Sequence, residues 1–154
     1  MTSPCSPVLH TSGYISFVLS FVAPKFHPSM ASPIILSVLY DHYMLRKSFP
    51  LALRSGIPYS SIGSHADILL FSMKKTVRFL WGNDTSRPFG LYPPAICPNE
   101  VCCQVLPWTS RSVSTDLVTL KCRHCKHVLR FPKPEGLTSV SIKHGHKWYE
   151  RSED

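Results

Sequence analysis

The sequence is short of acidic residues, of glycine and of long apolar runs, and each shortage excludes a class of protein. Nine Asp and Glu stand against 17 Lys and Arg in 154 residues, so the formal net charge is +8. Seven glycines exclude collagen. The apolar run from Tyr14 to Ala23 is too short to cross a bilayer. We therefore expect a basic protein with no transmembrane span.

Basic residues are also missing ahead of this apolar run, where a secretory signal peptide carries its positive segment. Secretion is therefore the less favoured interpretation. We expect an intracellular protein, in the nucleus or the cytoplasm.

The motifs of several enzyme classes are missing as well. The chain has no phosphate-binding loop, no nucleophile elbow and no helical His-Glu pair for zinc hydrolysis. It also lacks the His-x-Glu and Pro-Cys-x-x-Cys elements of zinc deaminases. These absences predict a non-enzymatic protein. The positive charge favours an anionic partner such as nucleic acid.

The length of the chain fits one domain at most, or a small domain with a poorly ordered extension. Its hydrophobic content of 44% argues against complete disorder. Shifts in composition divide the chain into five segments. These are an irregular Pro/Ser-rich apolar region (1–63), an amphipathic helix (64–82), a Pro-rich linker (83–96), a cysteine-rich module (97–148) and a tail (149–154).

Prolines interrupt every apolar stretch of the first segment, which holds half of the chain's prolines. Only a short helix near residues 34–47 is expected there, with Pro33 in its first turn. We interpret residues 1–63 as a region that is not a well-selected folding unit.

Residues 64–82 show helical spacing. Ser64 is a candidate N-cap, with Asp67 three residues later, and Gly82 supplies a stop signal. Between them, apolar residues recur at intervals of three and four. They are Ala66, Leu69, Leu70, Met73, Val77, Leu80 and Trp81.

Five of the six cysteines fall between Cys97 and Cys125, and this clustering favours metal ligation over a disulfide scaffold. Cys122-x2-Cys125 has the usual spacing for a zinc knuckle, and Cys97-x4-Cys102 lies at the long end of the range. Cys103 is an alternative to Cys102 because the two are adjacent. The residues between the pairs suit a β-hairpin, since Leu117–Leu120 and His127–Phe131 are β-prone.

Residues 95–132 resemble the zinc ribbon, a family in which a β-hairpin joins two cysteine knuckles. Cys97, Pro98, Cys102, Cys122 and Cys125 carry the resemblance, and Trp108 is the expected packing residue. The first knuckle departs from the family, in which two residues more often separate the cysteines. The resemblance implies that Cys97, Cys102, Cys122 and Cys125 bind a structural Zn²⁺. Zinc ribbons recognise nucleic acid or protein, or brace a larger assembly.

The stretch from Lys121 to Lys133 contains five basic residues and no acidic residue. They are Lys121, Arg123, Lys126, Arg130 and Lys133. Such a patch predicts phosphate binding, and exposed Phe131 and Trp108 would add base stacking. The alternatives are a protein-interaction or purely structural zinc module, such as a fragment of a larger family, and a thiol redox protein. The oligomeric state is left open.

The expected fold class is α+β. It comprises an irregular N-terminal region, one amphipathic helix and a small antiparallel zinc-ribbon-like β module, whose folding depends on its metal.

Overall fold

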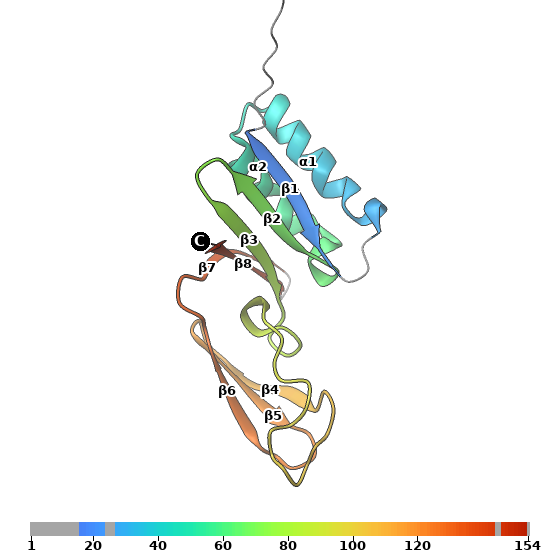
Figure 1. The fold of residues 1–154 in the computed structure, drawn as a ribbon, viewed down its shortest axis with the longest axis vertical. Coiled ribbons are helices and arrows are strands. Elements are labelled where there is room, and N and C mark those ends of the chain that lie inside the picture. Colours follow the sequence, from blue (N-terminus) through green and yellow to red (C-terminus); the bar gives the residue numbers. More distant parts are fainter. Residues whose placement is uncertain (1–15, 24–26, 144–145, 154) are drawn as a thin grey trace, which may run out of the picture.

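The computed structural model describes residues 16–23, 27–143 and 146–153. This part of the chain forms two α-helices and two antiparallel sheets, one of five strands and one of three (Figure 1). The predicted α+β class is confirmed, with more sheet than helix.

The larger sheet has the strand order β1-β2-β3-β8-β7, in which every neighbouring pair is antiparallel. This sheet joins the N-terminal half of the chain to its last strand. β3 pairs with β8 from Thr76↔Glu153 to Gly82↔Lys147. The strand bounds are Phe17–Val22 (β1), Asp67–Ser72 (β2), Thr76–Gly82 (β3), Thr138–Lys143 (β7) and His146–Glu153 (β8).

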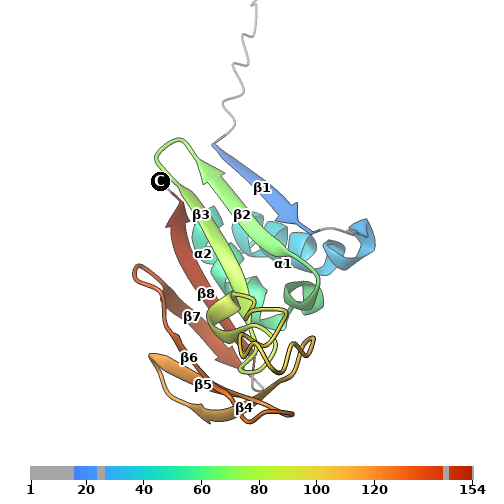
Figure 2. The same cartoon turned by 60° about the horizontal axis from the view of Figure 1, so that its bottom comes forward.

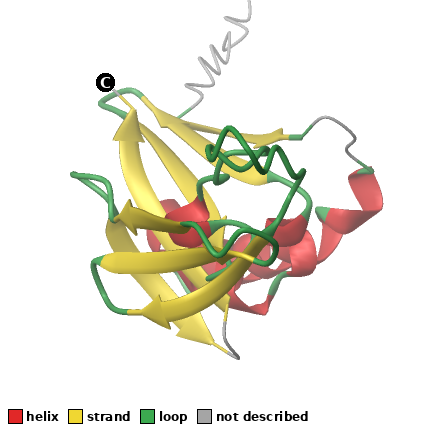
Figure 3. Ribbon diagram, turned by 90° about the horizontal axis from the view of Figure 1, so that it is seen from below, coloured by secondary structure: helices red, strands yellow, loops and turns green. Residues whose placement is uncertain are grey.

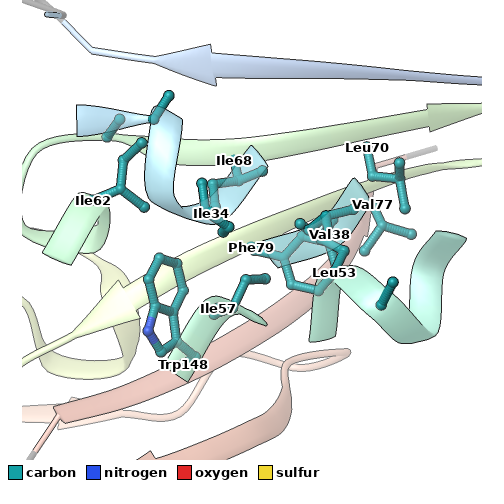
Figure 4. Close-up of a cluster of buried hydrophobic side chains, with 13 residues drawn as sticks. Ile34, Val38, Leu53, Ile57, Ile62, Ile68, Leu70, Val77, Phe79 and Trp148 are labelled. Atoms are coloured by element: carbon teal, nitrogen blue, oxygen red, sulfur yellow. The ribbon is translucent and has the colours of Figure 1, made fainter. Parts of the chain in front are cut away.

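Two helices cover one face of this sheet: α1 (Ser32–Tyr43) and α2 (Phe49–Gly56). Figure 4 shows their apolar side chains meeting those of the strands, and Figure 3 shows both helices gathered on one side of the strands. Phe79 and Leu53 are fully buried in this first core. Short 3-10 turns complete the layer and its connections: η1 (Pro28–Met30), η2 (Ile57–Tyr59), η3 (Ser61–Ser64) and η4 (Pro88–Gly90).

The smaller sheet has the order β4-β5-β6 and lies beyond the end of the larger sheet where β3 finishes (Figures 1 and 2). Its strands are Trp108–Val113 (β4), Leu117–Cys122 (β5) and Val128–Pro132 (β6). Trp108 is buried as expected, and its Nε1 donates a hydrogen bond to the Pro94 carbonyl at 2.7 Å.

A second core joins the two sheets. Consecutive side chains of a strand point to opposite faces. Phe79 therefore enters the first core while Leu80 enters the second, and Trp148 and Tyr149 divide in the same way. Leu80 and Tyr149 pack with buried residues of the smaller sheet, including Leu120. The larger sheet is thus covered by helices on one face and partly by the smaller sheet on the other.

The loop after β3 depends on a glycine. Gly90 has a φ of +79°, and an added Cβ there would overlap the side chain of Leu80. Positive φ costs glycine little because it has no Cβ. The chain can therefore turn tightly against β3 before it enters the smaller sheet.

The helix predicted over residues 64–82 is wrong. These residues form η3 and the β2–β3 hairpin. The helical pattern omits Ile68, Phe71 and Phe79, which are apolar and β-prone. In the structure Val77 and Phe79 alternate toward the helices, which is the period of a strand.

The irregular region predicted for residues 1–63 is also wrong where the structure describes it. Residues of β1, α1 and α2 pack into the first core. The short helix expected near 34–47 is present as α1, with Pro33 in its first turn. Proline tolerates this position because the first helical N–H groups have no partner within the helix.

The boundaries predicted after residue 97 need correction too. Of the module predicted over 97–148, the segments β7 and the start of β8 belong to the larger sheet. The predicted tail, 149–154, is the rest of β8 as far as Glu153. Residues 83–96 contain no strand, but Phe89 is buried in the second core, so the segment is more than a linker.

Among the described residues, neither helix has the length and apolar character that crossing a membrane requires.

The burial of Leu53 gives a direct test that the N-terminal third is part of the folded unit. We expect Leu53→Ala to lower the free energy of unfolding by about 2–5 kcal/mol, through lost burial and a cavity. Leu51 lies in the same helix but is 51% exposed. Leu51→Ala is therefore the matched control, with an effect within about 0.5 kcal/mol. Equal effects of both substitutions in denaturant unfolding would contradict the packing of α2.

Candidate metal centre

Four cysteines converge at the end of the smaller sheet. The Sγ atoms of Cys97, Cys102, Cys122 and Cys125 all lie within 4.8 Å of one another. Cys97 and Cys122 are buried, Cys102 is half-buried and Cys125 is exposed. A group of thiols this close could hold a metal ion.

The first knuckle is built on a turn around Asn99. The Cys102 N–H donates to the Asn99 carbonyl at 2.8 Å, and the Val101 N–H donates to Asn99 Oδ1 at 3.1 Å. Asparagine favours such turns because its side chain accepts a backbone N–H nearby. This turn accommodates the two extra residues between Cys97 and Cys102. Cysteine spacing alone does not reveal the role of Asn99, although Pro98-Asn99 is a turn signal.

Both knuckles repeat one hydrogen-bond pattern. The Cys97 N–H donates to the Gln104 carbonyl at 2.9 Å, and the Cys122 N–H donates to the His127 carbonyl at the same distance. In each case the acceptor lies two residues after the second cysteine of the knuckle. The residue directly after that cysteine has positive φ, at Cys103 (45°) and Lys126 (65°). Cys102 thus corresponds to Cys125.

Cys103, next to Cys102 in the sequence, has an environment different from that of the four converging thiols. Cys103 is exposed, lies outside the group of four thiols, and donates from Sγ to the Glu100 carbonyl at 3.1 Å. Between the alternatives left open by the sequence, the geometry therefore places Cys102 with the other three thiols.

The thiol pKa values differ across the group. Burial raises the pKa of Cys97 to about 12. Burial also opposes ionisation of Cys122, but N–H groups of Cys125 and His124 and neighbouring thiols outweigh it and lower its pKa to about 7. The Gln104 N–H lowers the pKa of Cys102, and burial and neighbouring thiols reverse this to a net rise. Among Cys97, Cys102 and Cys122, the pKa is lowered only at Cys122.

The thiols that the redox hypothesis names differ in their access to solvent, since Cys103 and Cys125 are exposed and Cys122 is buried. None of the five described cysteines forms a disulfide. The low-pKa thiol, Cys122, is fully buried, so a disulfide substrate could not reach its sulfur.

The basic residues predicted to bind nucleic acid do not all share one surface. Thr119 and Lys121 alternate with buried Val118 and Leu120, so they face away from the second core. Arg130 stands opposite Thr119 on β6, on the same outward face. Arg123 and Lys126 are exposed on the second knuckle beside this face.

Lys133 lies elsewhere. It is half-buried and lines a hollow between the smaller sheet and β8, together with Lys147 and Tyr149. We call the remaining four residues, Lys121, Arg123, Lys126 and Arg130, the basic ribbon surface. Among the described residues, none of these four makes an ion pair, although Lys126 Nζ donates to the Arg123 carbonyl at 2.6 Å.

The two aromatic residues considered for base stacking pack inward instead. Trp108 is 4% exposed, and Phe131 packs against the second core. Both occupy positions on the apolar side of the smaller sheet, where burial stabilises it. The exposure that base stacking by Trp108 would require is therefore absent.

Comparisons of the chain with protein-family models, with curated proteins and with solved structures give no match.

Cys102 and Cys103 are adjacent, so substituting each in turn gives a matched test of which thiols hold the metal. We expect Cys102→Ser to lower the metal bound per chain, because it removes one of the four thiols, whereas Cys103→Ser should leave it unchanged. Elemental mass spectrometry on the full chain purified under reducing conditions measures both. Cys122→Ser is the positive control for loss. Loss of metal on Cys103→Ser with retention on Cys102→Ser would contradict the geometry.

Proposed function

We propose that the chain is a non-enzymatic binding module built around a structural Zn²⁺, with nucleic acid as its partner. The observation that carries the zinc assignment is the spacing of the thiols. The Cys97–Cys125 and Cys102–Cys122 Sγ distances are 3.6 and 3.7 Å. Four sulfurs held about 2.3 Å from a tetrahedral zinc lie about 3.8 Å apart. These two separations match a tetrahedral zinc site, and the remaining pairs of sulfurs lie within 4.8 Å.

Four thiolates around zinc complete its coordination, and such closed sites stabilise structure. When bound, the metal supplies the cross-link between the two knuckles. The chain's own N–H groups orient the sulfurs, since N–H groups of Asn99 and His124 reach Cys97 and Cys122. Reduced cysteines persist in the nucleus and the cytoplasm, which supports an intracellular location.

The basic ribbon surface supports nucleic acid as the partner. It presents four cations with no ion-pair partner among the described residues, so its charge is available to phosphate. Zinc with four thiolates carries a net charge of about −2, which offsets only part of this. Since Trp108 is buried, we propose contacts to the phosphate backbone without base stacking.

Charge reversal tests this surface. We expect the triple variant Arg123→Glu, Lys126→Glu and Arg130→Glu to abolish binding of fluorescent single-stranded and duplex oligonucleotides at low salt. Binding by the wild type should weaken with salt, with a log–log slope of about 0.7–0.9 for every phosphate that the protein neutralises. Fluorescence anisotropy over a salt series measures both quantities, and metal content confirms that the module is intact.

The matched control reverses three exposed cations that lie away from the ribbon: Arg46, Lys74 and Lys75. Its formal charge change is the same, so a purely nonspecific charge effect would weaken both variants equally. Equal weakening, or full binding by the ribbon variant, would overturn the assignment.

A protein partner is the second candidate, and the first knuckle favours it. Four large apolar side chains there are exposed to solvent: Ile96, Val101, Val105 and Leu106. Val101 is 97% exposed. Clustered exposed apolar residues are a feature of interaction surfaces. Association through this knuckle would be insensitive to salt, in contrast to phosphate binding.

An experiment can distinguish the nucleic-acid partner from the protein partner. If the knuckle carries the binding, Val101→Ser with Val105→Ser should abolish association with a protein partner at high salt and leave the oligonucleotide affinity unchanged. Loss of oligonucleotide binding in that variant, with metal retained, would contradict separate roles for the two surfaces.

A further inference from the structure

A second group of charged residues lies away from the metal centre, at the end of β2 that approaches the smaller sheet (Figure 1). Its centre is Asp67, a buried carboxylate. Arg78 Nη2 donates to Asp67 Oδ2 and Arg87 Nη2 donates to Asp67 Oδ1, both at 2.7 Å. One carboxylate is thus shared by two guanidinium groups.

Asp67 cannot neutralise both arginines, so the group keeps a net positive charge, which is buried at Arg87 and partly open to solvent at Arg78, whose side chain is 31% exposed. The side chains of Asp67 and Arg87 are each 8% exposed. Glu153 lies on the same face of the sheet and already pairs with Arg151, the cross-strand neighbour of Arg78. Three arginines therefore face two carboxylates. A buried charge without a partner is unfavourable, so the site favours a further anion.

Unused hydrogen-bond donors point to the same conclusion. The Nε atoms of Arg78 and Arg87 are both buried and have no hydrogen-bond partner among the described residues. The Nη1 groups also have none in the described hydrogen bonds, whereas a guanidinium offers five donors. A buried donor without a partner calls for an explanation, and a bound water or ion is one of them.

The loop that carries Arg87 is held in one conformation. Asn83 and Arg87 exchange two backbone hydrogen bonds of 3.0 Å, and Asn83 Oδ1 accepts from the Thr85 and Ser86 N–H groups. Arg87 Nη2 also donates to the Gly90 carbonyl at 2.8 Å. Phe89 in this loop has a φ of +54°, a strained conformation for a residue with a side chain. Arg87 is therefore fixed before any ligand arrives.

The charged group opens into a hollow of about 440 Å³. Its lining combines these charged residues with His65 and with apolar contributions from Val22, Ala23 and Ala66. Tyr92 completes the lining and lies against Arg87, whose Cζ is 4.6 Å from the ring centroid. The volume exceeds that of a bare anion and falls in the range of small-molecule sites.

We propose that this hollow binds a small organic oxyanion, with its carboxylate or phosphate group at Arg78 and Arg87 and its flat organic body along Tyr92. Arginine suits such a head group because its planar fork matches two oxygens at once. The aromatic ring and the apolar wall favour an organic body over a free inorganic ion. The site is independent of the metal centre and of the basic ribbon surface.

The test uses four probes on the full chain: acetate, benzoate, inorganic phosphate and phenyl phosphate. Isothermal titration calorimetry should show benzoate or phenyl phosphate binding more tightly than acetate or phosphate. The tighter of the two aromatic probes identifies the head group. Arg78→Gln should weaken that probe at least about tenfold, because a charge-assisted hydrogen bond is lost. Tyr92→Ala, at an exposed side chain, should remove the advantage of the aromatic probes.

Two controls locate the binding. Arg54→Gln removes an arginine that pairs with Glu150 on the helix-covered face of the same sheet, and it should bind the probes as wild type does. The triple charge reversal on the basic ribbon surface should also bind them unchanged. Failure of all four probes to bind at millimolar concentration would overturn the proposal. So would unchanged affinity in both Arg78→Gln and Tyr92→Ala, or loss of affinity only in the ribbon variant.

Discussion

The pairing of β3 with β8 is the constraint on which the rest of the structure depends. Neighbouring residues on each strand serve different layers: Phe79 and Trp148 pack under the helices, and Leu80 and Tyr149 pack against the smaller sheet. A shift of one residue in this register would exchange the two sets of side chains. Both hydrophobic cores, and the attachment of the metal-binding sheet, therefore rest on one pair of strands.

The metal centre is coupled to this packing through its own ligands. Cys97 and Cys122 belong to the four-thiol group and also to the second core, beside Leu120. A three-stranded sheet buries too little apolar surface to be stable alone, and metal binding supplies folding free energy to modules of this size. The smaller sheet is thus anchored by the four-thiol group at one end and by the larger sheet through the second core.

The sequence predicts the local features well and the long-range ones poorly. Cysteine spacing indicates the knuckles, and β-prone runs indicate β5 and β6, because the residues that make up each signal lie close together in the chain. The β2–β3 hairpin resembles a helix in sequence because Leu70, Met73 and Val77 recur at helical intervals when Phe79 is left out. Packing decides the outcome, as it often does for short apolar runs.

Two other features have no usable local signal. β1 pairs with β2 across a large separation in sequence, from Phe17↔Ser72 to Val22↔Asp67, so its strand character depends on a partner that a local pattern does not show. The group formed by Asp67, Arg78 and Arg87 likewise has no recognisable signal in the sequence. Its members are scattered along the chain, and the local pattern indicates a helix-capping role for Asp67, whereas it is the shared partner of two arginines.

The position of the smaller sheet within the chain affects the entropic cost of pairing β3 with β8. In the sequence, the smaller sheet lies between Gly82, where β3 ends, and His146, where β8 begins, and these two strands must pair. Bringing those ends together costs loop-closure entropy, which grows with the length of free chain between them. A cross-link between the knuckles, from Cys97 to Cys125, shortens that length. A metal held by the four thiols would therefore bring β8 to β3 over a smaller effective loop, and would lower the entropic cost of completing a sheet that contains none of these cysteines.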